Sequence, residues 1–375
     1  MGEEVKENAP LELERLIAAV RDFTPERLTL AREMAGLDIK DVAERIQATP
    51  SAVSQLESGR TRPKAETLIR LALALGVRPQ FLGAPALPQI APESCFFRSR
   101  KSTTMRERRR VLAHGTILKQ LADYLGEFVV FPEEQLTPLR RQLSDRSQIE
   151  EFSITVRDAW HLGQGPISDM IGLLEDRGVL PVEVPGHSER LDAFSAWIGG
   201  KPLVFLTVDK GSSSRRRFDA AHELAHLLLH DASCETQAAE IEREADAFAS
   251  AFLLPAVPFL AECPRRLDWN RLRALKRRWG VSLAAIVRRA FDLRIFGEAT
   301  YRRAYSVLNQ VGWRTNEPDE PSMERPALLQ RALRLLQQAG HSPGRVAADL
   351  RIREGALVDL VLPARHEQIA LVQSP

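Results

Sequence analysis

The sequence predicts a mostly helical α+β protein with an all-α N-terminal domain, a following α+β domain with a small sheet, and a helical C-terminal region. Its 375 residues exceed one ordinary domain of roughly 100–200 residues. Helical spacing of apolar residues fills 24–80, whereas short β-type runs occur at 179–184, 193–198 and 203–208, followed by further helical patterns. With 44% hydrophobic and 27% charged residues, the chain can bury a core, which excludes general disorder.

Composition shifts divide the chain into four expected parts. The all-α domain spans 1–83 and ends where proline becomes frequent, between Pro79 and Pro92. A linker and a basic helical connector occupy 84–150. The α+β domain covers 151–314, and the polar, proline-bearing stretch near 315–324 introduces the helical region 315–375.

Neither a membrane span nor export is expected. The longest uncharged run, 247–261, contains Pro255 and Pro258 and falls short of the ~18–20 apolar residues that a span requires. The start, MGEEVKENAP, lacks the basic and then apolar character of a signal peptide. Three scattered cysteines cannot form a disulfide framework, so we expect a cytoplasmic protein. The net charge of +2 hides any local segregation of basic and acidic residues.

Residues 24–80 have the pattern of a helix-turn-helix. Asp38 begins one short helix, Thr49 followed by Pro50 begins the next, and Ser58 with Gly59 ends it before a basic loop. A short helix of this kind fits a DNA major groove about 12 Å wide. The stretch IKDVAERIQATPSAVSQLESGRTRPKAETLIRLALALGV, 39–77, resembles the XRE (Cro-repressor-type) helix-turn-helix family.

This resemblance implies contacts with a double-stranded DNA operator. The residues expected to face base edges are Ser51, Ala52 and Gln55, and those expected to approach phosphates are Thr49, Arg60, Arg62 and Lys64. One copy of the motif reads a half-site, so the DNA-bound form is expected to be a homodimer. The alternative is a helical bundle used for protein contacts.

A second motif, HELAH, lies in the helical stretch FDAAHELAHLLLH at 218–230. His222 and His226 are four residues apart, so both imidazoles lie on one helix face and can bind one Zn²⁺, with Glu223 beside them as general base. His230 would lie about 6 Å beyond His226 at 1.5 Å rise per residue, which indicates a helix-end histidine instead of a ligand.

The third zinc ligand is sought in the acidic helical stretch 240–255. Glu242 is the expected ligand, and Asp246, four residues on, is expected to orient a ligating histidine. Glu244 is the runner-up and Glu240 a weaker choice, and each acidic residue has the alternative of a solvated face.

The strings AHELAHLLLH and EREADAFASAFLLP together resemble the ImmA/IrrE family of zinc metallo-endopeptidases, which have a zincin-like fold. The resemblance implies peptide hydrolysis at zinc held by His222, His226 and Glu242, in which Glu223 takes a proton from water and delivers it to the leaving amine. The implied protein substrate is a repressor or an antitoxin-like partner in a stress or mobile-element response. The family often has Asn where this chain has Asp246.

Three alternatives stay open. The peptidase-like domain of a transcriptional regulator or antitoxin can instead be a sensor or a structural zinc module without turnover. The strand 193–198 or 203–208 either holds a peptide as an added strand or lies buried. The basic segment 94–110 either contacts phosphates or packs, through Phe96 and Phe97, with its charges on acidic groups of the peptidase domain.

Overall fold

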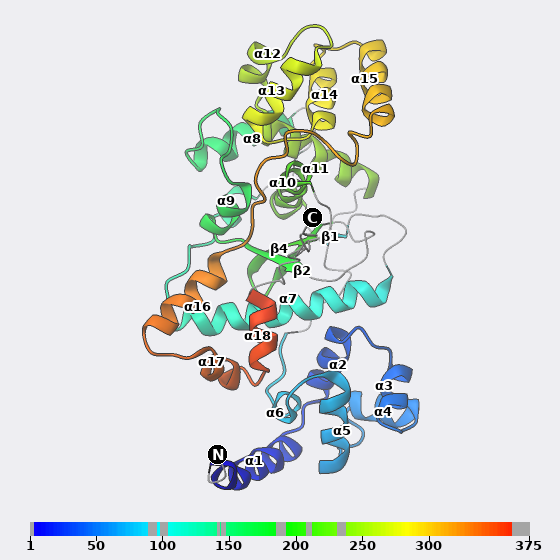
Figure 1. Ribbon diagram of the computed structural model, residues 1–375, viewed down its shortest axis with the longest axis vertical. Helices are drawn as coiled ribbons and strands as arrows, with labels where there is room; N and C mark the ends of the chain where they lie inside the picture. The colour runs from blue at the N-terminus through cyan, green and yellow to red at the C-terminus, as the bar shows by residue number, and fades with distance from the viewer. Residues whose placement is uncertain are drawn as a thin grey trace, which may run out of the picture. The chain divides into compact units, whose positions relative to one another are not determined.

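The structure is a computed structural model that describes residues 4–88, 96–97, 104–140, 143, 148–184, 193–207, 212–230 and 238–361. It comprises two compact units, each described by itself. The first unit takes residues 1–89, 104–130 and 329–375, and the second takes 90–103 and 131–328. Figure 1 shows the elements with their labels.

The described helices are α1 (Glu4–Arg21), α2 (Pro25–Met34), α3 (Ile39–Arg45), α4 (Pro50–Glu57), α5 (Ala65–Leu75), α6 (Pro79–Leu82), α7 (Met105–Gly126), α8 (Gln148–Ala159), α9 (Met170–Asp176), α10 (Ser213–Leu229), α11 (Ala238–Leu253), α12 (Ala256–Glu262), α13 (Trp269–Trp279), α14 (Leu283–Asp292), α15 (Glu298–Gln310), α16 (Leu328–Gln338), α17 (Pro343–Asp349) and α18 (Glu354–Val361), with a 3₁₀ turn η2 at Thr137–Leu139.

The first unit is all-α and contains the predicted helix-turn-helix as α3 and α4. The Thr49 side chain accepts the Ala52 backbone N–H, which caps α4 as the sequence predicts. Gly76 ends α5 in the left-handed conformation, φ 71°, that glycine adopts without steric cost. The core of this helical module includes the fully buried Leu28, Val42, Val53, Leu68 and Leu71.

The second unit contains a four-stranded sheet in the order β1-β3-β4-β2. Its strands are β1 (Phe96–Phe97), β2 (Leu180–Val184), β3 (Phe194–Ile198) and β4 (Lys201–Thr207). β3 is antiparallel to both β1 and β4, whereas β2 and β4 are parallel. Gly199 and Gly200 both have positive φ, 53° and 80°, and join β3 to β4 in the predicted hairpin.

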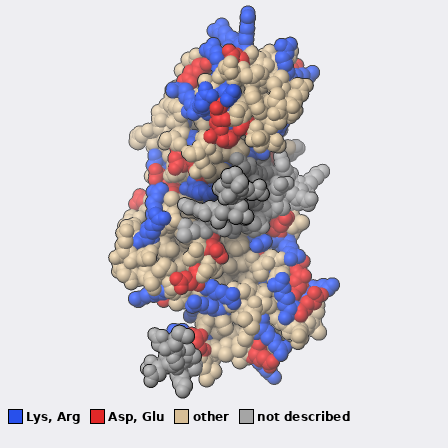
Figure 2. Space-filling view, viewed as in Figure 1, with Lys and Arg blue, Asp and Glu red and all other residues tan. Residues whose placement is uncertain are grey.

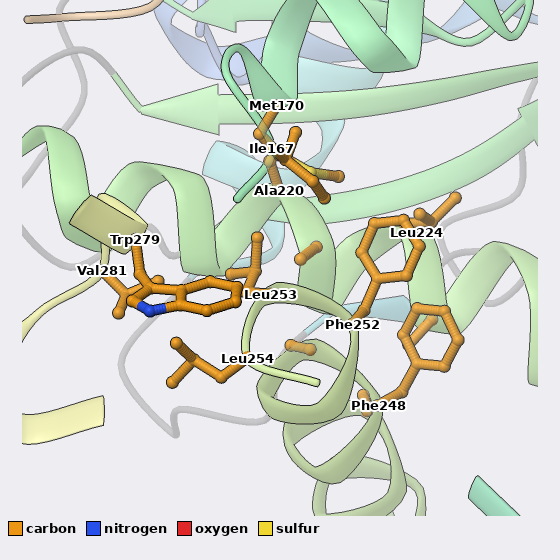
Figure 3. Packing of buried hydrophobic residues seen from close by; sticks show 14 of the residues in the cluster. Ile167, Met170, Ala220, Leu224, Phe248, Phe252, Leu253, Leu254, Trp279 and Val281 are labelled. Carbon is orange, nitrogen blue, oxygen red and sulfur yellow. The ribbon is translucent and has the colours of Figure 1, made fainter. Parts of the chain in front are cut away.

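Helix α10 packs on β3 and β4 and against α11, so it lies between the sheet and α11 (Figure 1). Ala220, Ala221 and Leu224 of α10 are fully buried. On α11, the rings of Phe248 and Phe252 stack with their centroids 5.3 Å apart (Figure 3). Helix α10, which carries HELAH, and helix α11, which carries the acidic stretch, thus pack directly against each other.

The polar stretch 315–327 is tied to the second unit by three glutamates. Glu317 and Glu320 accept hydrogen bonds from the fully buried Lys276 of α13, at 2.6 and 2.5 Å. Glu320 also accepts the Ser214 N–H, in the first turn of α10. Glu324 pairs with Arg217 and accepts the backbone N–H groups that begin α9. This arrangement places three acidic groups where helix N-termini and buried cations favour negative charge.

The predicted fold class is confirmed: an all-α N-terminal domain precedes an α+β domain with a small sheet, and the described C-terminal region is helical. The boundaries at 83, 150 and 314 stay predictions. Within the described residues, no single helix is long and apolar enough to cross a membrane, and the bent pair Ala239–Leu253 and Ala256–Glu262 passes that test of length and composition together.

Candidate metal centre and nucleic-acid interface

The HELAH sequence lies in the second half of α10, as its periodicity predicts. Ser212 caps the helix by accepting the Arg215 N–H, and the backbone runs unbroken to Leu229. His222, Glu223 and His226 each retain only 1% of their exposure. These three polar side chains are therefore held inside the protein, where an unpaired polar group is costly.

Three possible ligand atoms converge between α10 and α11. The Nε2 atoms of His222 and His226 lie 3.0 Å apart. Carboxylate oxygens of Glu242 lie 3.5 Å from His222 Nε2 and 3.7 Å from His226 Nε2. One ligand atom from each residue lies within 4.8 Å of the other two, a spacing that can hold a metal ion. The sequence predicted this same set of three residues.

Asp246 contacts the far side of the His222 ring. Its carboxylate lies 2.9 Å from His222 Nδ1, so the ring can donate there while Nε2 faces Glu242. Burial lowers the pKa of His222, but hydrogen bonds with Asp246 and Glu242 outweigh burial and raise the pKa to about 9. Asp246 thus makes the contact predicted for it, although the family often has Asn there.

The far side of the His226 ring contacts a second histidine. His226 Nδ1 lies 2.9 Å from His230 Nδ1, and His230 Nε2 lies 3.0 Å from the carboxylate of Glu244. Glu244, the runner-up ligand, therefore approaches His230, while Glu240 is exposed. The sequence predicted His230 only as a helix-end residue. The four-residue spacing between His226 and His230 was the sequence signal that could have predicted their contact.

Glu223 has a partner on the sheet that the sequence did not reveal. Ser195 of β3 is fully buried and donates its hydroxyl to Glu223 Oε2 at 2.8 Å. Burial raises the pKa of Glu223 to about 8, against the opposing effects of His222 and of the Ser195 hydrogen bond. A divalent cation beside this carboxyl group would favour its ionised form, as a general base requires.

The chemistry of the donor set fits zinc. Two imidazoles and one carboxylate leave a coordination position open, as in catalytic zinc sites. Each ring presents Nε2 toward the centre, and its Nδ1 has a hydrogen-bonding partner, Asp246 or His230. Such contacts fix the tautomer and the ring orientation of metal-binding histidines.

The residues predicted to approach DNA lie on α4 and the loop after it. Thr49, Ser51, Gln55, Arg60, Arg62 and Lys64 are exposed, and Ala52 is half-buried. Val53 and Leu56 lie on the opposite face of α4 and are buried in the core. The Arg62 side chain donates to the Arg21 carbonyl at 2.6 Å. All of the residues predicted to contact DNA, except the half-buried Ala52, are therefore accessible to solvent.

The basic segment 94–110 is described only in part. Arg98, Arg100 and Lys101 lie outside the described residues. Arg106 donates to the Gly36 carbonyl and pairs with Asp38 at 3.4 Å, within the first unit. This acidic partner belongs to the helix-turn-helix module, not to the peptidase domain that the packing alternative named.

The fold and the two sites define a protein with a helix-turn-helix module followed by a metallopeptidase-like domain. Comparison with protein-family models gives the families: residues 28–82 match the helix-turn-helix model and residues 174–291 match the IrrE N-terminal-like domain. The chain is thus a fusion of an XRE-type helix-turn-helix domain and an IrrE-like peptidase domain, as its motifs predicted. No curated protein matches the chain.

Proposed function

We propose that this protein is a DNA-binding transcriptional regulator whose second domain is a zinc-dependent endopeptidase. The observation that carries the proposal is the convergence of His222, His226 and Glu242 within 4.8 Å beside the buried Glu223. A domain that only bound metal would need the three ligands but would not need an acidic group hydrogen-bonded next to them.

In this proposal, His222, His226 and Glu242 hold zinc, which supplies Lewis-acid activation of water and of the scissile carbonyl. Glu223 takes the proton of the attacking water and delivers it to the leaving amine. The Ser195 hydroxyl, 2.8 Å from Glu223 Oε2, holds the carboxylate in position during both transfers. The burial of His222, Glu223, His226 and Ser195 keeps bulk water away from them, which strengthens their electrostatic interactions.

The partners that we propose follow from the two domains. The helix-turn-helix domain binds an operator in double-stranded DNA, and the peptidase cleaves a repressor or antitoxin-like protein, so that proteolysis changes transcription in a stress or mobile-element response. A homodimer on DNA is supported by exposed apolar side chains on the packed helices α1 and α5: Leu13 and Ile17 are each 59% exposed and Leu73 is 70% exposed. We place the protein in the cytoplasm, where it meets DNA.

The test compares zinc-loaded wild-type protein with the Glu223→Gln variant. Each is incubated with candidate repressors, including the protein's own helix-turn-helix domain, and products are identified by mass spectrometry. We expect cleavage by the wild type and none by Glu223→Gln, with equal zinc content. Zinc binding without cleavage by the wild type would instead indicate a sensor or structural zinc domain.

A matched pair on α11 tests the metal ligand. Glu242→Gln is expected to lower zinc affinity strongly, because a neutral amide replaces the carboxylate ligand. The same substitution at the exposed Glu240 is the control and should leave affinity unchanged. Equal zinc affinity of the Glu242→Gln variant and the wild type would remove Glu242 from the ligand set.

A further inference from the structure

The strand β1 lies on the outer edge of β3. β3 pairs with β4 on one side, and on its other side Phe96 and Phe97 pair antiparallel with it. The register places Phe96 opposite Ser195 and Phe97 opposite Phe194. In sequence, β1 lies between the ranges 1–89 and 104–130 of the first unit, although it pairs within the second. A piece of the linker thus provides the edge strand of the peptidase sheet.

This edge is the one beside the general base. Ser195, which faces Phe96 across the β1–β3 pair, donates to Glu223 at 2.8 Å. Helix α10, which carries Glu223 and both histidines, packs on β3 and β4. The sequence offered β3 and β4 as strands that could bind a peptide. β4 lies between β3 and β2, so both of its edges are paired. β3 is therefore the strand on which an extended peptide can be added next to these residues.

Strand addition gives affinity through backbone hydrogen bonds and accepts many sequences. An edge strand can pair with only one further strand at a given position, because each backbone N–H and C=O on that edge is used once. Where β1 is paired, a second extended peptide cannot pair with Phe194 and Ser195. The edge of β3 therefore cannot pair with β1 and with a substrate in that register at the same time.

We propose that β1 occupies the substrate-binding edge of β3, so that the chain's own linker competes in cis with any peptide substrate of the peptidase. The inference rests on the proposed endopeptidase function and specifies how that site is regulated and what it binds, an extended segment antiparallel to β3. A substrate gains access when the linker leaves this edge.

Tethering makes the competition effective even if the pairing is weak. A segment on a short flexible linker has an effective concentration on the order of 1 mM. If the free segment bound with a Kd of about 0.1 mM, tethering at that concentration would weaken binding of an added peptide about tenfold. With a tether of this kind, a segment that binds only weakly when free therefore still competes measurably.

The test uses the full-length chain with Glu223→Gln, loaded with zinc, so that no peptide is cleaved. The probe is a fluorescein-labelled peptide of residues 91–101, APESCFFRSRK, and binding is measured by fluorescence anisotropy. In one protein the linker is intact, and in the other Phe96→Pro and Phe97→Pro remove both backbone N–H donors of β1. We expect about tenfold tighter binding to the proline variant.

Equal affinity for the two proteins, or binding to neither, would overturn the proposal. The control carries Gln89→Pro and Ala91→Pro, the same number of prolines in the linker outside β1, and should bind like the intact protein. An equal gain in this control would assign the effect to linker stiffness and would also overturn the proposal. The readout does not involve hydrolysis, so a failure of the proposed peptidase activity leaves this outcome readable.

Hydrogen exchange on the same proteins gives a second measurement that does not depend on the probe. The β3 amide that points toward β1, at Phe194 or Ser195, should exchange faster in the Phe96→Pro and Phe97→Pro variant than in the intact chain, because proline disrupts the β1–β3 pairing. Unchanged exchange over residues 193–198 would show that β1 does not cover this edge and would contradict the proposal.

Discussion

The two candidate histidine ligands, His222 and His226, differ in the side chains that their Nδ1 atoms contact. His222 Nδ1 contacts the carboxylate of Asp246 directly, whereas His226 Nδ1 reaches the carboxylate of Glu244 through His230. If His226 Nε2 binds a metal, its proton must be on Nδ1 and is donated to His230 Nδ1. His230 then carries its own proton on Nε2 and donates it to Glu244. This order requires a neutral His230, and burial lowers the pKa of that ring despite the opposing effect of Glu244.

A substitution at His230 should therefore weaken zinc binding without removing a ligand. We expect His230→Phe to lower zinc affinity by about 10- to 100-fold, because the ring of His226 loses the acceptor that fixes its tautomer. Competition with a chromophoric zinc chelator measures this change. His230→Gln, whose amide oxygen can accept the proton, should recover part of the affinity. An unchanged zinc affinity of His230→Phe would show that this histidine only ends the helix.

At the level of elements, α4 and its following loop separate base contacts from phosphate contacts. In gel-shift titrations over a range of salt concentrations, Gln55→Ala should weaken specific DNA binding by about 1–3 kcal/mol with an unchanged salt slope. Arg60→Ala should instead reduce the salt slope by about 0.9, since one phosphate contact is lost. A Gln55→Ala variant that binds every sequence equally less well would contradict base reading by this residue.

The buried Lys276 predicts how the second unit responds to substitution. Lys276→Met leaves Glu317 and Glu320 without their cation, a change that costs about 3 kcal/mol or more. For a unit of this size we expect a fall in Tm of about 6–12 °C in thermal melts at neutral pH. Arg278→Met, which removes a surface pair with Glu262, is the control and should change Tm by only about 1–3 °C.

The same cluster predicts a loss of stability in acid. Burial raises the pKa of Glu320, but hydrogen bonds from Lys276 and Ser214 outweigh burial, so the folded-state pKa lies below its ordinary value of 4.5. The resulting stabilisation is present above the unfolded pKa and is lost as pH falls through the folded pKa. The difference in Tm between wild type and Lys276→Met should thus narrow below about pH 4.5. A difference that stays constant down to pH 3 would contradict this linkage.

Local patterns predicted the elements, and contacts between distant residues completed the site. The four-residue spacing in HELAH placed two histidines on one face of α10, and Gly199-Gly200 predicted the β3–β4 hairpin. Ser195 could not be assigned to Glu223 from spacing, because the two residues lie on different elements that meet only after the sheet packs on α10. The two-residue β1 has no alternating pattern long enough to detect.

At the scale of the whole molecule, the near balance of 52 basic and 50 acidic residues reflects internal pairing as well as surface charge. Arg216 and Arg217, from the basic run that precedes HELAH, pair inside the second unit with Glu183 and Glu324. They are therefore unavailable to phosphates. On the face shown in Figure 2, basic and acidic side chains lie interspersed. The exposed basic side chains predicted for DNA are those of the loop after α4.

Two units with separate cores predict that metal stabilises only one of them. Zinc that binds the folded site at 100 times its Kd adds about 2.7 kcal/mol to the second unit, which should raise its Tm by about 5–10 °C. Differential scanning calorimetry with and without a chelator should therefore move one transition and leave that of the first unit in place. The Glu242→Gln variant should melt like the chelated wild type under both conditions. If the chelator shifted neither transition, zinc would not be bound by the folded protein, and the peptidase proposal would lose its metal.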